Sequence, residues 1–499
     1  MLKKWLAWIG GVLGICALGL YIFYKLYVGA VNVPVSEYSH DISAVSQQIN
    51  VPDGFSVSIF AEDVPNARLM QVTRNGDLLV ANPNLNQIIL LQADHNGDGR
   101  TDAKRLLLEG LKGPNGMDFH EGWLYVAETD AIGRIAFDHQ AGQVTGAYER
   151  IVTGLPGGEN HWKKTLRFGP DGLMYLTVGS SCNVCLEADE RRATMMRYQP
   201  DGSGEEIFAR GLRNSAGFDW SPVDGAIYAT DNGRDLLGDD FPPCELNRVE
   251  EGRHYGWPFV NGDNIPDPDF GEGNESYVGE AIPPVHGFRA HNAPLGIVFL
   301  THASWPAEYR HAAIVALHGS WNRSRKDGYK VVSLHWLPNG RIEERDFMTG
   351  FLKDDTAFGR PAEVAEGADG SLYIADDYAG VIYRVKASAD PLTETVVEMA
   401  TRDSDSAYDI EETLAVFDAD SRSRLVMEGE ALYQKFDCQT CHAPEAENTV
   451  VLENLGSRYN LEKLDAMFRA PVAPMPAFPL TDTEIKSLSV YLLSVENQP

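Results

Sequence analysis

Five consecutive residues near the C-terminus, Cys438-Gln439-Thr440-Cys441-His442, carry the most specific chemistry in the chain. Their pattern is C-x-x-C-H, in which two thiols can add to the two vinyl groups of one haem while the adjacent His offers its imidazole to the iron. The alternatives are a thioredoxin-like thiol pair or half of a zinc site. A zinc site would need a second Cys/His pair nearby, and His442 is the last histidine in the sequence. The motif therefore predicts one covalently attached haem c, linked through Cys438 and Cys441 and ligated by His442.

The residues on both sides of this motif predict helices. Leu432 and Phe436 fall on one face of a helix just before it. The stretch from Thr481 to Glu484 reads as a capping box that opens a closing helix, whose inward face carries three apolar residues. These three residues are Ile485, Leu488 and Leu492.

Between these two helices, a proline-rich segment surrounds Met475 and could present its thioether to the iron. Met467 is the rival ligand, but its neighbours are typical of a packed helix face. Residues 422–499 thus resemble a small class I cytochrome c, an all-α domain. The resemblance implies His442 and Met475 as iron ligands and a haem that carries electrons.

The N-terminus has the pattern of a membrane anchor. Lys3 and Lys4 precede residues 5–24, which contain no charged side chain and are long enough to cross a bilayer as a helix. A cleaved signal peptide is the alternative. We expect residues 1–30 to be a transmembrane anchor and 31–50 a linker. With the cytochrome resemblance, this predicts a single-pass protein of the bacterial inner membrane whose catalytic and haem domains lie in the periplasm.

Charge and cysteine content narrow the classes of partner. The chain has 42 basic and 72 acidic side chains, a formal net charge of −30, and such a surface repels nucleic acid. Cys182 and Cys185 could close a small disulfide loop in an oxidising compartment. A metal pair or a catalytic dithiol is the alternative at these two residues.

One strand pattern returns six times between residues 51 and 390. In five copies a turn precedes a short apolar strand that ends in small and polar residues, and the fifth copy in order lacks the turn. The six strands are Leu78–Asn82, Trp123–Glu128, Leu173–Gly179, Ala226–Asp231, Ala313–His318 and Leu372–Asp376. The period of about fifty residues predicts an all-β six-bladed propeller, with an insertion at 258–285. A β-sandwich or two stacked β domains are the alternatives.

In a propeller, the polar residues that follow the six repeated strands should converge near the central axis. Between the propeller and the cytochrome domain, residues 391–421 read as an acidic linker.

A haem fused to a large exported domain suggests that this domain supplies electrons. No G-x-G-x-x-G follows a strand, which argues against a Rossmann flavin or nicotinamide site. A quinone cofactor would meet the requirement. Several phrases resemble the sorbosone/pyranose and soluble glucose dehydrogenases that use pyrroloquinoline quinone (PQQ). These phrases are 154–161, Arg167–Gly172, Gly211–Asn214, Gly256–Pro258 and Gly319–Arg323. The resemblance covers about residues 50–390 and implies a six-bladed propeller with PQQ and calcium at the channel mouth.

The resemblance also implies roles for individual residues. His161 matches the catalytic histidine. Arg213 and Asn214 match a cofactor-binding pair, and Arg360 matches an arginine that holds PQQ carboxylates. His318 stands where the glucose enzymes carry a lysine, and a second arginine near Ala362 is missing.

The calcium ligands follow in the same way. Gly233 and Arg234 fall where backbone carbonyls hold calcium, with Asp239 or Asp240 close behind. Apart from the resemblance, Asp94–Asp102 reads D-x-N-x-D-G-x-x-D, the opening of a calcium loop, but Arg105 stands where the bidentate Glu is expected. A plain turn is the alternative at that segment.

Together these patterns predict a membrane-anchored PQQ-dependent dehydrogenase that oxidises a sugar and passes electrons to its own haem c. A respiratory acceptor, either a quinone or another cytochrome, would take them onward. Two alternatives come from other classes. One is a calcium-dependent, lactonase-like hydrolase that uses Asp231 and His161 on water, and the other is a non-enzymatic electron-relay propeller.

Overall fold

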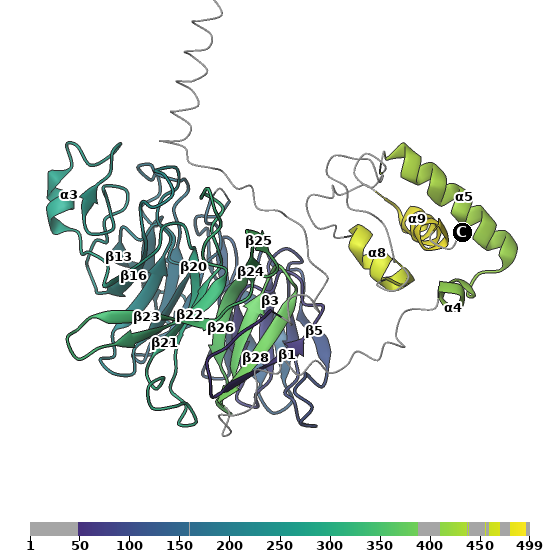
Figure 1. Cartoon of the computed structure of the whole chain (residues 1–499), viewed down its shortest axis with the longest axis horizontal. Helices are drawn as coiled ribbons and strands as arrows, with labels where there is room; N and C mark the ends of the chain where they lie inside the picture. Colours follow the sequence, from purple (N-terminus) through teal and green to yellow (C-terminus); the bar gives the residue numbers. More distant parts are fainter. Residues whose placement is uncertain are drawn as a thin grey trace, which may run out of the picture. The chain divides into compact units, whose positions relative to one another are not determined.

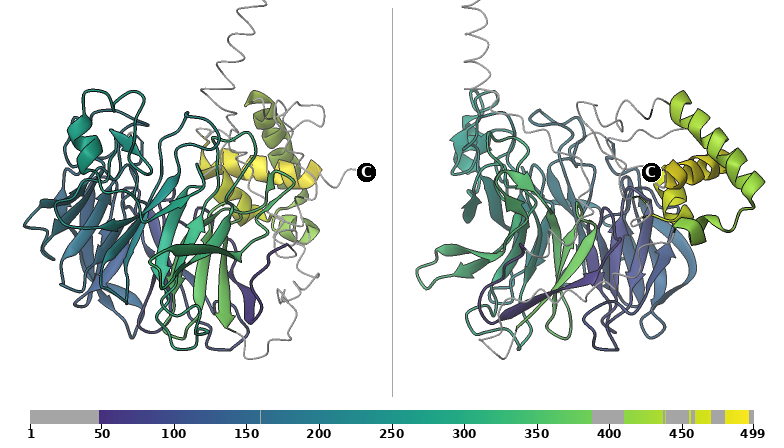
Figure 2. Two further views of the ribbon diagram at one scale, coloured as in Figure 1. Left: turned by 60° about the vertical axis from the view of Figure 1, so that its left-hand side comes forward. Right: turned by 45° about the vertical axis from the view of Figure 1, so that its right-hand side comes forward.

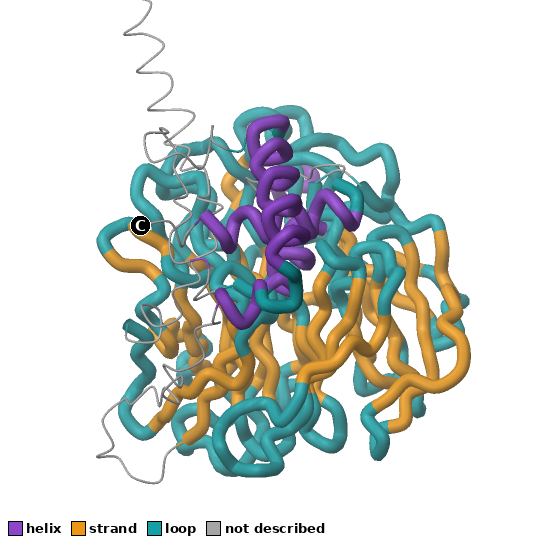
Figure 3. Tube along the Cα trace, turned by 90° about the vertical axis from the view of Figure 1, so that its right-hand side faces the viewer, coloured by secondary structure: helices purple, strands orange, loops and turns teal. Residues whose placement is uncertain are grey.

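The structure is a computed structural model that describes residues 48–158, 160–387, 410–436, 438, 455, 459–469 and 480–495. These residues belong to two compact units, one built of strands and one of helices (Figures 1 and 3). The predicted anchor 1–30, nearly all of the linker 31–50 and most of the acidic linker 391–421 lie outside the described residues. Among the residues that are described, no helix is both long and apolar enough to span a membrane.

The strand unit consists of six four-stranded antiparallel sheets, arranged as the blades of a propeller (Figure 2). Blade 1 contains β2 (Met70–Val72), β3 (Leu78–Asn82), β4 (Gln87–Leu91) and β5 (Lys104–Leu108). Blade 2 contains β6 (Met117–His120), β7 (Trp123–Ala127), β8 (Ala131–Asp138) and β9 (Gln143–Thr153). Blade 3 contains β10 (Leu166–Phe168), β11 (Met174–Val178), β12 (Thr194–Tyr198) and β13 (Glu206–Arg210).

The other half of the ring repeats this plan. Blade 4 contains β14 (Gly217–Trp220), β15 (Ile227–Asp231), β16 (Cys244–Val249) and β19 (His286–Phe288). Blade 5 contains β20 (Pro294–Phe299), β21 (Ala313–Leu317), β22 (Lys330–Trp336) and β23 (Ile342–Met348). Blade 6 contains β26 (Pro361–Glu366), β27 (Leu372–Asp376), β28 (Val381–Ala387) and β1 (Phe55–Ala61). The predicted six-bladed propeller is therefore confirmed, and the sandwich alternative is wrong.

Each repeated phrase found in the sequence forms the second strand of its blade, namely β3, β7, β11, β15, β21 or β27. Nearly every residue of these strands is buried. A second strand is hydrogen-bonded on both edges and faces a neighbouring blade on each side, so the apolar run is continuous rather than alternating. This is why these strands gave the strongest signal in the sequence.

Strand β1 closes the ring by pairing with β28 as the outermost strand of blade 6. Phe55 at its start is buried against the rings of Trp305, Tyr309 and Phe347. This pairing completes the fourth strand of blade 6 with residues from the start of the propeller, and it covers the edge of β28 that would otherwise be free.

Two small additions interrupt the blades. The predicted insertion lies between the third and fourth strands of blade 4 and holds β17 (Val260–Asn261), β18 (Ile265–Pro266) and the short helix α3 (Glu275–Glu280) (Figure 1). A hairpin of β24 (Leu352–Lys353) and β25 (Thr356–Ala357) precedes blade 6.

The helical unit contains α4 (Ile410–Leu414), α5 (Ala419–Lys435), α8 (Leu461–Arg469) and α9 (Asp482–Val495). The predicted inward residues Ile485, Leu488 and Leu492 are buried together with Leu432, and Phe436 packs against them. The predicted capping box is also present. The Thr481 amide donates to the Glu484 carboxylate at 2.9 Å, and the Glu484 amide donates to the Thr481 hydroxyl at 3.3 Å.

Candidate active site

A cavity of about 230 Å³ lies where the chain enters the innermost strands of the propeller. These strands, β2, β6, β10, β14, β20 and β26, contact one another around the axis. The residues just before or at the start of each of the six contribute to the cavity wall. Its polar lining residues are Arg68, Asn115, His161, Lys163, Thr165, Asn214 and Glu363. Side chains from blades that are far apart in sequence therefore meet at one place.

His161 lines this cavity from the loop that leads into β10. Its backbone φ is +48°, a region that non-glycine residues rarely adopt. Gly179 makes room for it, because a Cβ on this glycine would lie 2.5 Å from the His161 Cβ. The predicted catalytic histidine is thus held in a fixed, unusual conformation on the wall.

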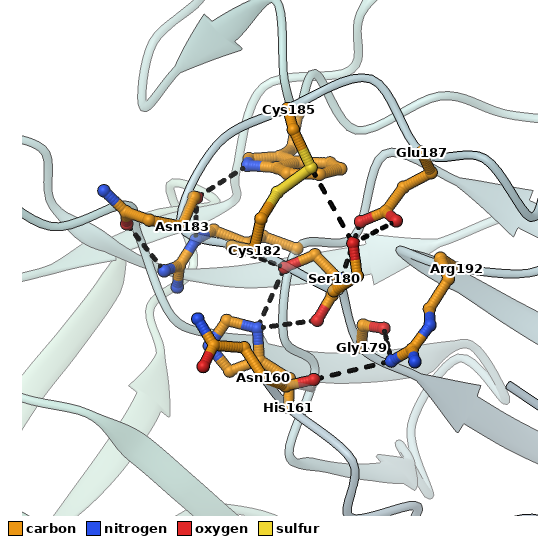
Figure 4. Close-up of a disulfide and its surroundings, with 12 residues drawn as sticks. Asn160, His161, Gly179, Ser180, Cys182, Asn183, Cys185, Glu187 and Arg192 are labelled. Carbon is orange, nitrogen blue, oxygen red and sulfur yellow. Dashed lines mark hydrogen bonds between the residues drawn. A yellow bond between two sulfur atoms is a disulfide. The ribbon is translucent and has the colours of Figure 1, made fainter. Parts of the chain in front are cut away.

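The hydrogen bonds of His161 define which ring nitrogen is free (Figure 4). Its Nδ1 lies 2.8 Å from the Ser180 hydroxyl and 3.2 Å from the Ser180 carbonyl oxygen. The Ser180 hydroxyl donates its single proton to the Cys182 carbonyl at 2.8 Å. The Ser180 hydroxyl oxygen and the Ser180 carbonyl oxygen must therefore both accept from Nδ1. The proton therefore sits on Nδ1, and Nε2 carries the lone pair that can act as a base.

The ring of His161 is neutral at physiological pH. Burial and the positive charge of Arg213 lower the pKa of His161 to about 3. A neutral imidazole with a bare Nε2 can accept a proton from a hydroxyl group, although the lowered pKa makes it a weaker base than a solvent-exposed histidine.

Two cations, Arg68 and Lys163, stand on the cavity wall. The Arg68 guanidinium forms an ion pair with Asp377 at 2.5 Å. Burial and the nearby charges of Arg68 and Arg360 lower the pKa of Lys163 to about 7. Because guanidinium and ammonium groups bind carboxylates, this wall suits an anionic ligand.

His318 and Arg360 lie beside this wall rather than on it. Burial and Arg360 lower the pKa of His318 to about 3, and the neutral ring donates from Nε2 to Asp377 at 2.8 Å. The Arg360 guanidinium donates to the carbonyl oxygens of His318 at 3.1 Å and Gly319 at 3.2 Å. In this structure, His318 therefore holds Asp377, which in turn holds Arg68.

Arg213 and Asn214 have separate positions. Asn214 lines the cavity, whereas the buried Arg213 guanidinium donates to the backbone and side-chain oxygens of Asn183 and to the Asn232 carbonyl, all at 2.9 Å. Both backbone amides donate to the buried Asp231 carboxylate, and burial raises the pKa of Asp231 to about 7. Of the predicted pair, Asn214 therefore lines the cavity, whereas Arg213 bonds to the neighbouring loop that carries Asn183.

The residues predicted to bind calcium have protein partners here. The Arg234 guanidinium pairs with Asp267 at 2.7 Å, and Arg323 pairs with Asp240 at 3.0 Å. The Asp239 carboxylate accepts from the Ser324 amide at 2.9 Å. Gly233 packs closely against Pro243. These residues do not form a ready cation site in this arrangement, so the calcium assignment stays a prediction.

The other two candidate metal segments also have clear structures. Asp94 accepts three backbone amides, from Gly97, Asp98 and Gly99, and pairs with Arg384 at 3.0 Å, which favours the plain turn. Cys182 and Cys185 form the predicted disulfide. Within the described part of the chain, these two cysteines with Glu187 are the only group of three His, Cys, Asp or Glu residues close enough for one metal ion.

Only the start of the haem motif falls among the described residues. The Cys438 amide donates to the Tyr433 carbonyl at 3.1 Å, directly after α5. Cys441, His442 and Met475 lie outside the described residues, so their roles stay predictions. The rival Met467 lies in α8 and packs against the helical core, as its neighbours in the sequence indicated.

Arg68, Lys163 and Glu363 are site residues that the sequence did not reveal. The polar residues that follow the repeated strands, such as Ser180, Asp231 and Asp377, do gather at this end of the propeller. They do not line the cavity themselves. Each bonds to a lining residue: Ser180 to His161, Asp231 to Asn214 and Asp377 to Arg68. Arg68 and Lys163 could have been found from their position two or three residues before an innermost strand, whereas Glu363 lies within the first residues of β26.

Comparisons with known proteins match the strand unit and the helical unit to two different families. A family described as "Domain of unknown function (DUF7133)" matches residues 42–406, and one described as "Cytochrome C oxidase, cbb3-type, subunit III" matches residues 424–492. An uncharacterised protein of Borreliella burgdorferi is 30% identical over 357 residues, which are 68% of this chain and 91% of that protein.

More distant matches include dehydrogenases. A pyrroloquinoline quinone-dependent pyranose dehydrogenase of Coprinopsis cinerea is 22% identical over 415 residues, covering 70% of this chain and only 56% of that protein. The holo PQQ domain of a pyranose dehydrogenase from the same organism has a TM-score of 0.58 at 20% identity, covering 68% of this chain and 97% of that domain. A calcium structure of a Trichoderma reesei carbohydrate-active enzyme of family AA12 has a TM-score of 0.60 at 19% identity, with coverage of 68% and 97%. These structures share the propeller fold.

Proposed function

Because the chain belongs to the DUF7133 family and joins a PQQ sugar dehydrogenase-like propeller to a cytochrome c domain, we propose that it is a quinoprotein sugar dehydrogenase. It would oxidise an aldose, a pyranose or a sorbosone-like alcohol or aldehyde with PQQ. Its own haem c would take the electrons and pass them to a respiratory quinone or another cytochrome.

The cavity wall supports an anionic cofactor. PQQ is a tricarboxylate, and Arg68 and Lys163 place two cationic groups on the wall, with Arg360 beside them. Asn214 adds an amide that can donate or accept a hydrogen bond. When bound, PQQ would accept the two electrons that leave the sugar carbon and release them one at a time. The glucose dehydrogenases carry a lysine where His318 stands, and an arginine expected near Ala362 is missing from this chain. Arg68 and Lys163 would supply the positive charges in their place.

The position and hydrogen bonding of His161 are the main evidence for this proposal. Its Nε2 is unprotonated and belongs to a residue on the wall, so it can take the proton of a sugar hydroxyl as hydride leaves the adjacent carbon. The Asp240 carboxylate pairs with Arg323 and the Asp239 carboxylate accepts from the Ser324 amide, so calcium would have to compete with these partners for both residues.

The cytochrome domain supplies the acceptor. A cytochrome c domain implies a covalently held haem c, for which Cys438, Cys441 and His442 are the motif residues and Met475 the proposed sixth ligand. We also propose that residues 1–30 anchor the protein in the bacterial inner membrane with both domains in the periplasm. Activity that sediments with membranes, and that detergent but not high salt releases, is the expected result.

The test starts from purified protein that has its haem but no PQQ. Adding PQQ and calcium together with a panel of aldoses should reduce the haem, as seen in its visible spectrum. A His161→Ala variant should bind PQQ with near wild-type affinity yet reduce its haem about 10²–10⁴-fold more slowly, the usual cost of losing a general base.

Two outcomes would contradict the proposal. Hydrolysis of a lactone without PQQ would favour the lactonase-like alternative, although Asp231 is buried and its carboxylate is occupied by the amides of Arg213 and Asn214. Haem reduction by an external protein but by no sugar would favour the electron-relay alternative.

A further inference from the structure

The loop closed by the Cys182–Cys185 disulfide touches two residues of the site at once (Figure 4). Its first contact is the hydrogen bond from the buried Ser180 hydroxyl to the Cys182 carbonyl. The residues that flank the loop bond to each other, since the Ser181 amide and hydroxyl both donate to the Glu187 carboxylate at 2.7 Å. The disulfide lies between these two attachments.

Asn183, between the two cysteines, bonds to the neighbouring segment. Its carbonyl and side-chain oxygens accept from the Arg213 guanidinium, and its side-chain oxygen also accepts from the Asp235 amide at 2.8 Å. Its side-chain amide donates to the Asp235 carbonyl at 3.1 Å. The loop is therefore a bridge between the segment that carries Ser180 and the segment that carries Asp235.

The direction of the Ser180 hydroxyl proton decides what His161 can do. While the Cys182 carbonyl accepts this proton, the hydroxyl oxygen must accept from His161 Nδ1, and Nε2 is bare. If the Cys182 carbonyl moved away, the hydroxyl could rotate and donate to Nδ1, in competition with the Ser180 carbonyl, which can only accept from it. The ring would then carry its proton on Nε2, where it could no longer take one from a substrate.

We propose that the Cys182–Cys185 loop is the positioning element that keeps His161 in the Nδ1–H tautomer, with the disulfide holding the Cys182 carbonyl against Ser180. This inference rests on the proposed function insofar as it treats His161 as the base. The loop does not touch substrate in this mechanism, and it acts through Ser180.

The test compares three variants of the full-length, haem-loaded protein. Cys182→Ser with Cys185→Ser opens the loop and leaves the haem cysteines intact. Ser180→Ala keeps the disulfide but removes the hydroxyl. Ser203→Ala is the matched control, because this hydroxyl bonds only to Asp201 in an exposed turn between β12 and β13.

Two measurements distinguish positioning from a general loss of stability. The first is the ¹⁵N NMR signature of His161 in protein with labelled histidine, assigned by its disappearance in His161→Ala. We expect the wild type and Ser203→Ala to show a protonated Nδ1 and a bare Nε2, and the double variant to show a mixture of tautomers. The second is sugar-dependent haem reduction, which should fall by about 10²-fold in the double variant, as small misplacements of a catalytic group do. The fall in Ser180→Ala should be smaller, since the Ser180 carbonyl still accepts from Nδ1.

The outcomes are separable. If the double variant and Ser180→Ala both keep the wild-type tautomer and rate, the inference is wrong. If the double variant loses its folded thermal transition, the rate of Ser180→Ala decides: an unchanged rate would overturn the inference, because the loop acts on His161 through the Ser180 hydroxyl. If no sugar reduces the haem of the wild type but the tautomer still changes in the variants, the positioning role stands and the proposed function fails.

Discussion

Lys163 has a charge that changes within the physiological pH range. Its pKa is lowered to about 7, so its positive charge is present below that pH and is lost as pH rises through it. If Lys163 holds a PQQ carboxylate, affinity for PQQ should fall at high pH. Loss of one charge-assisted hydrogen bond corresponds to roughly tenfold or more in dissociation constant.

We therefore predict that the PQQ dissociation constant of the haem-loaded protein rises by about tenfold between pH 6 and pH 8.5, measured by cofactor absorbance or fluorescence. Lys163→Arg keeps its charge over this range and should remove most of the increase. Glu363 contributes in the same direction, because burial raises its pKa to about 7 and it becomes anionic on the cavity wall. A Lys163→Arg protein that keeps the full pH dependence, while Glu363→Gln loses it, would assign the effect to Glu363 alone.

At the scale of elements, the helical unit depends on close contact between α5 and α9. Gly429 in α5 faces α9 with no room for a side chain: a Cβ there would collide with the Ser487 carbonyl oxygen and lie 2.5 Å from the Tyr491 Cβ. The two helices can approach this closely because one of them has only hydrogen at the crossing point.

Gly429→Ala should therefore destabilise the helical unit even though alanine is the better helix former by about 1 kcal/mol. Overpacking costs typically 1–3 kcal/mol, and a collision with backbone puts this site in the upper part of that range, so after the gain in helix propensity we expect a net loss of about 1–2 kcal/mol in denaturant unfolding followed by haem absorbance. Gly279→Ala is the control, because a Cβ at this position in α3 meets nothing within 4 Å. Equal stability of Gly429→Ala and wild type would show that the helices separate at no cost.

At the scale of the whole molecule, the proposed electron donor and its proposed acceptor belong to one chain with a net charge of −30. Like-charged molecules repel one another at low ionic strength, which slows encounters between separate chains. Electron transfer within a chain needs no such encounter.

We predict that the observed rate constant for sugar-dependent haem reduction does not change when the protein is diluted tenfold at saturating PQQ and sugar. Stopped-flow spectroscopy at low and high ionic strength would measure it. A rate that scales with protein concentration, and that salt accelerates, would mean that one chain reduces the haem of another.

Several features could be read from the residues alone because their information is local. The haem motif is five consecutive residues. The helix faces around Leu432 and Ile485 follow from the period of the helix, and the second strands of the blades are short apolar runs that return about every fifty residues. His161 was indicated by the resemblance to PQQ-dependent dehydrogenases rather than by a local pattern, and the structure places it on the cavity wall.

The composition of that wall depended on tertiary structure. Arg68 meets Asp377 across 309 positions of sequence, because closing the ring brings blades 1 and 6 together. Arg213 and Arg234 have residue types suited to a cofactor site, yet one is turned toward Asn183 and the other toward Asp267. A buried guanidinium must have acceptors, and which acceptors lie within reach is set by the packing of the blades rather than by the neighbouring residues in the chain.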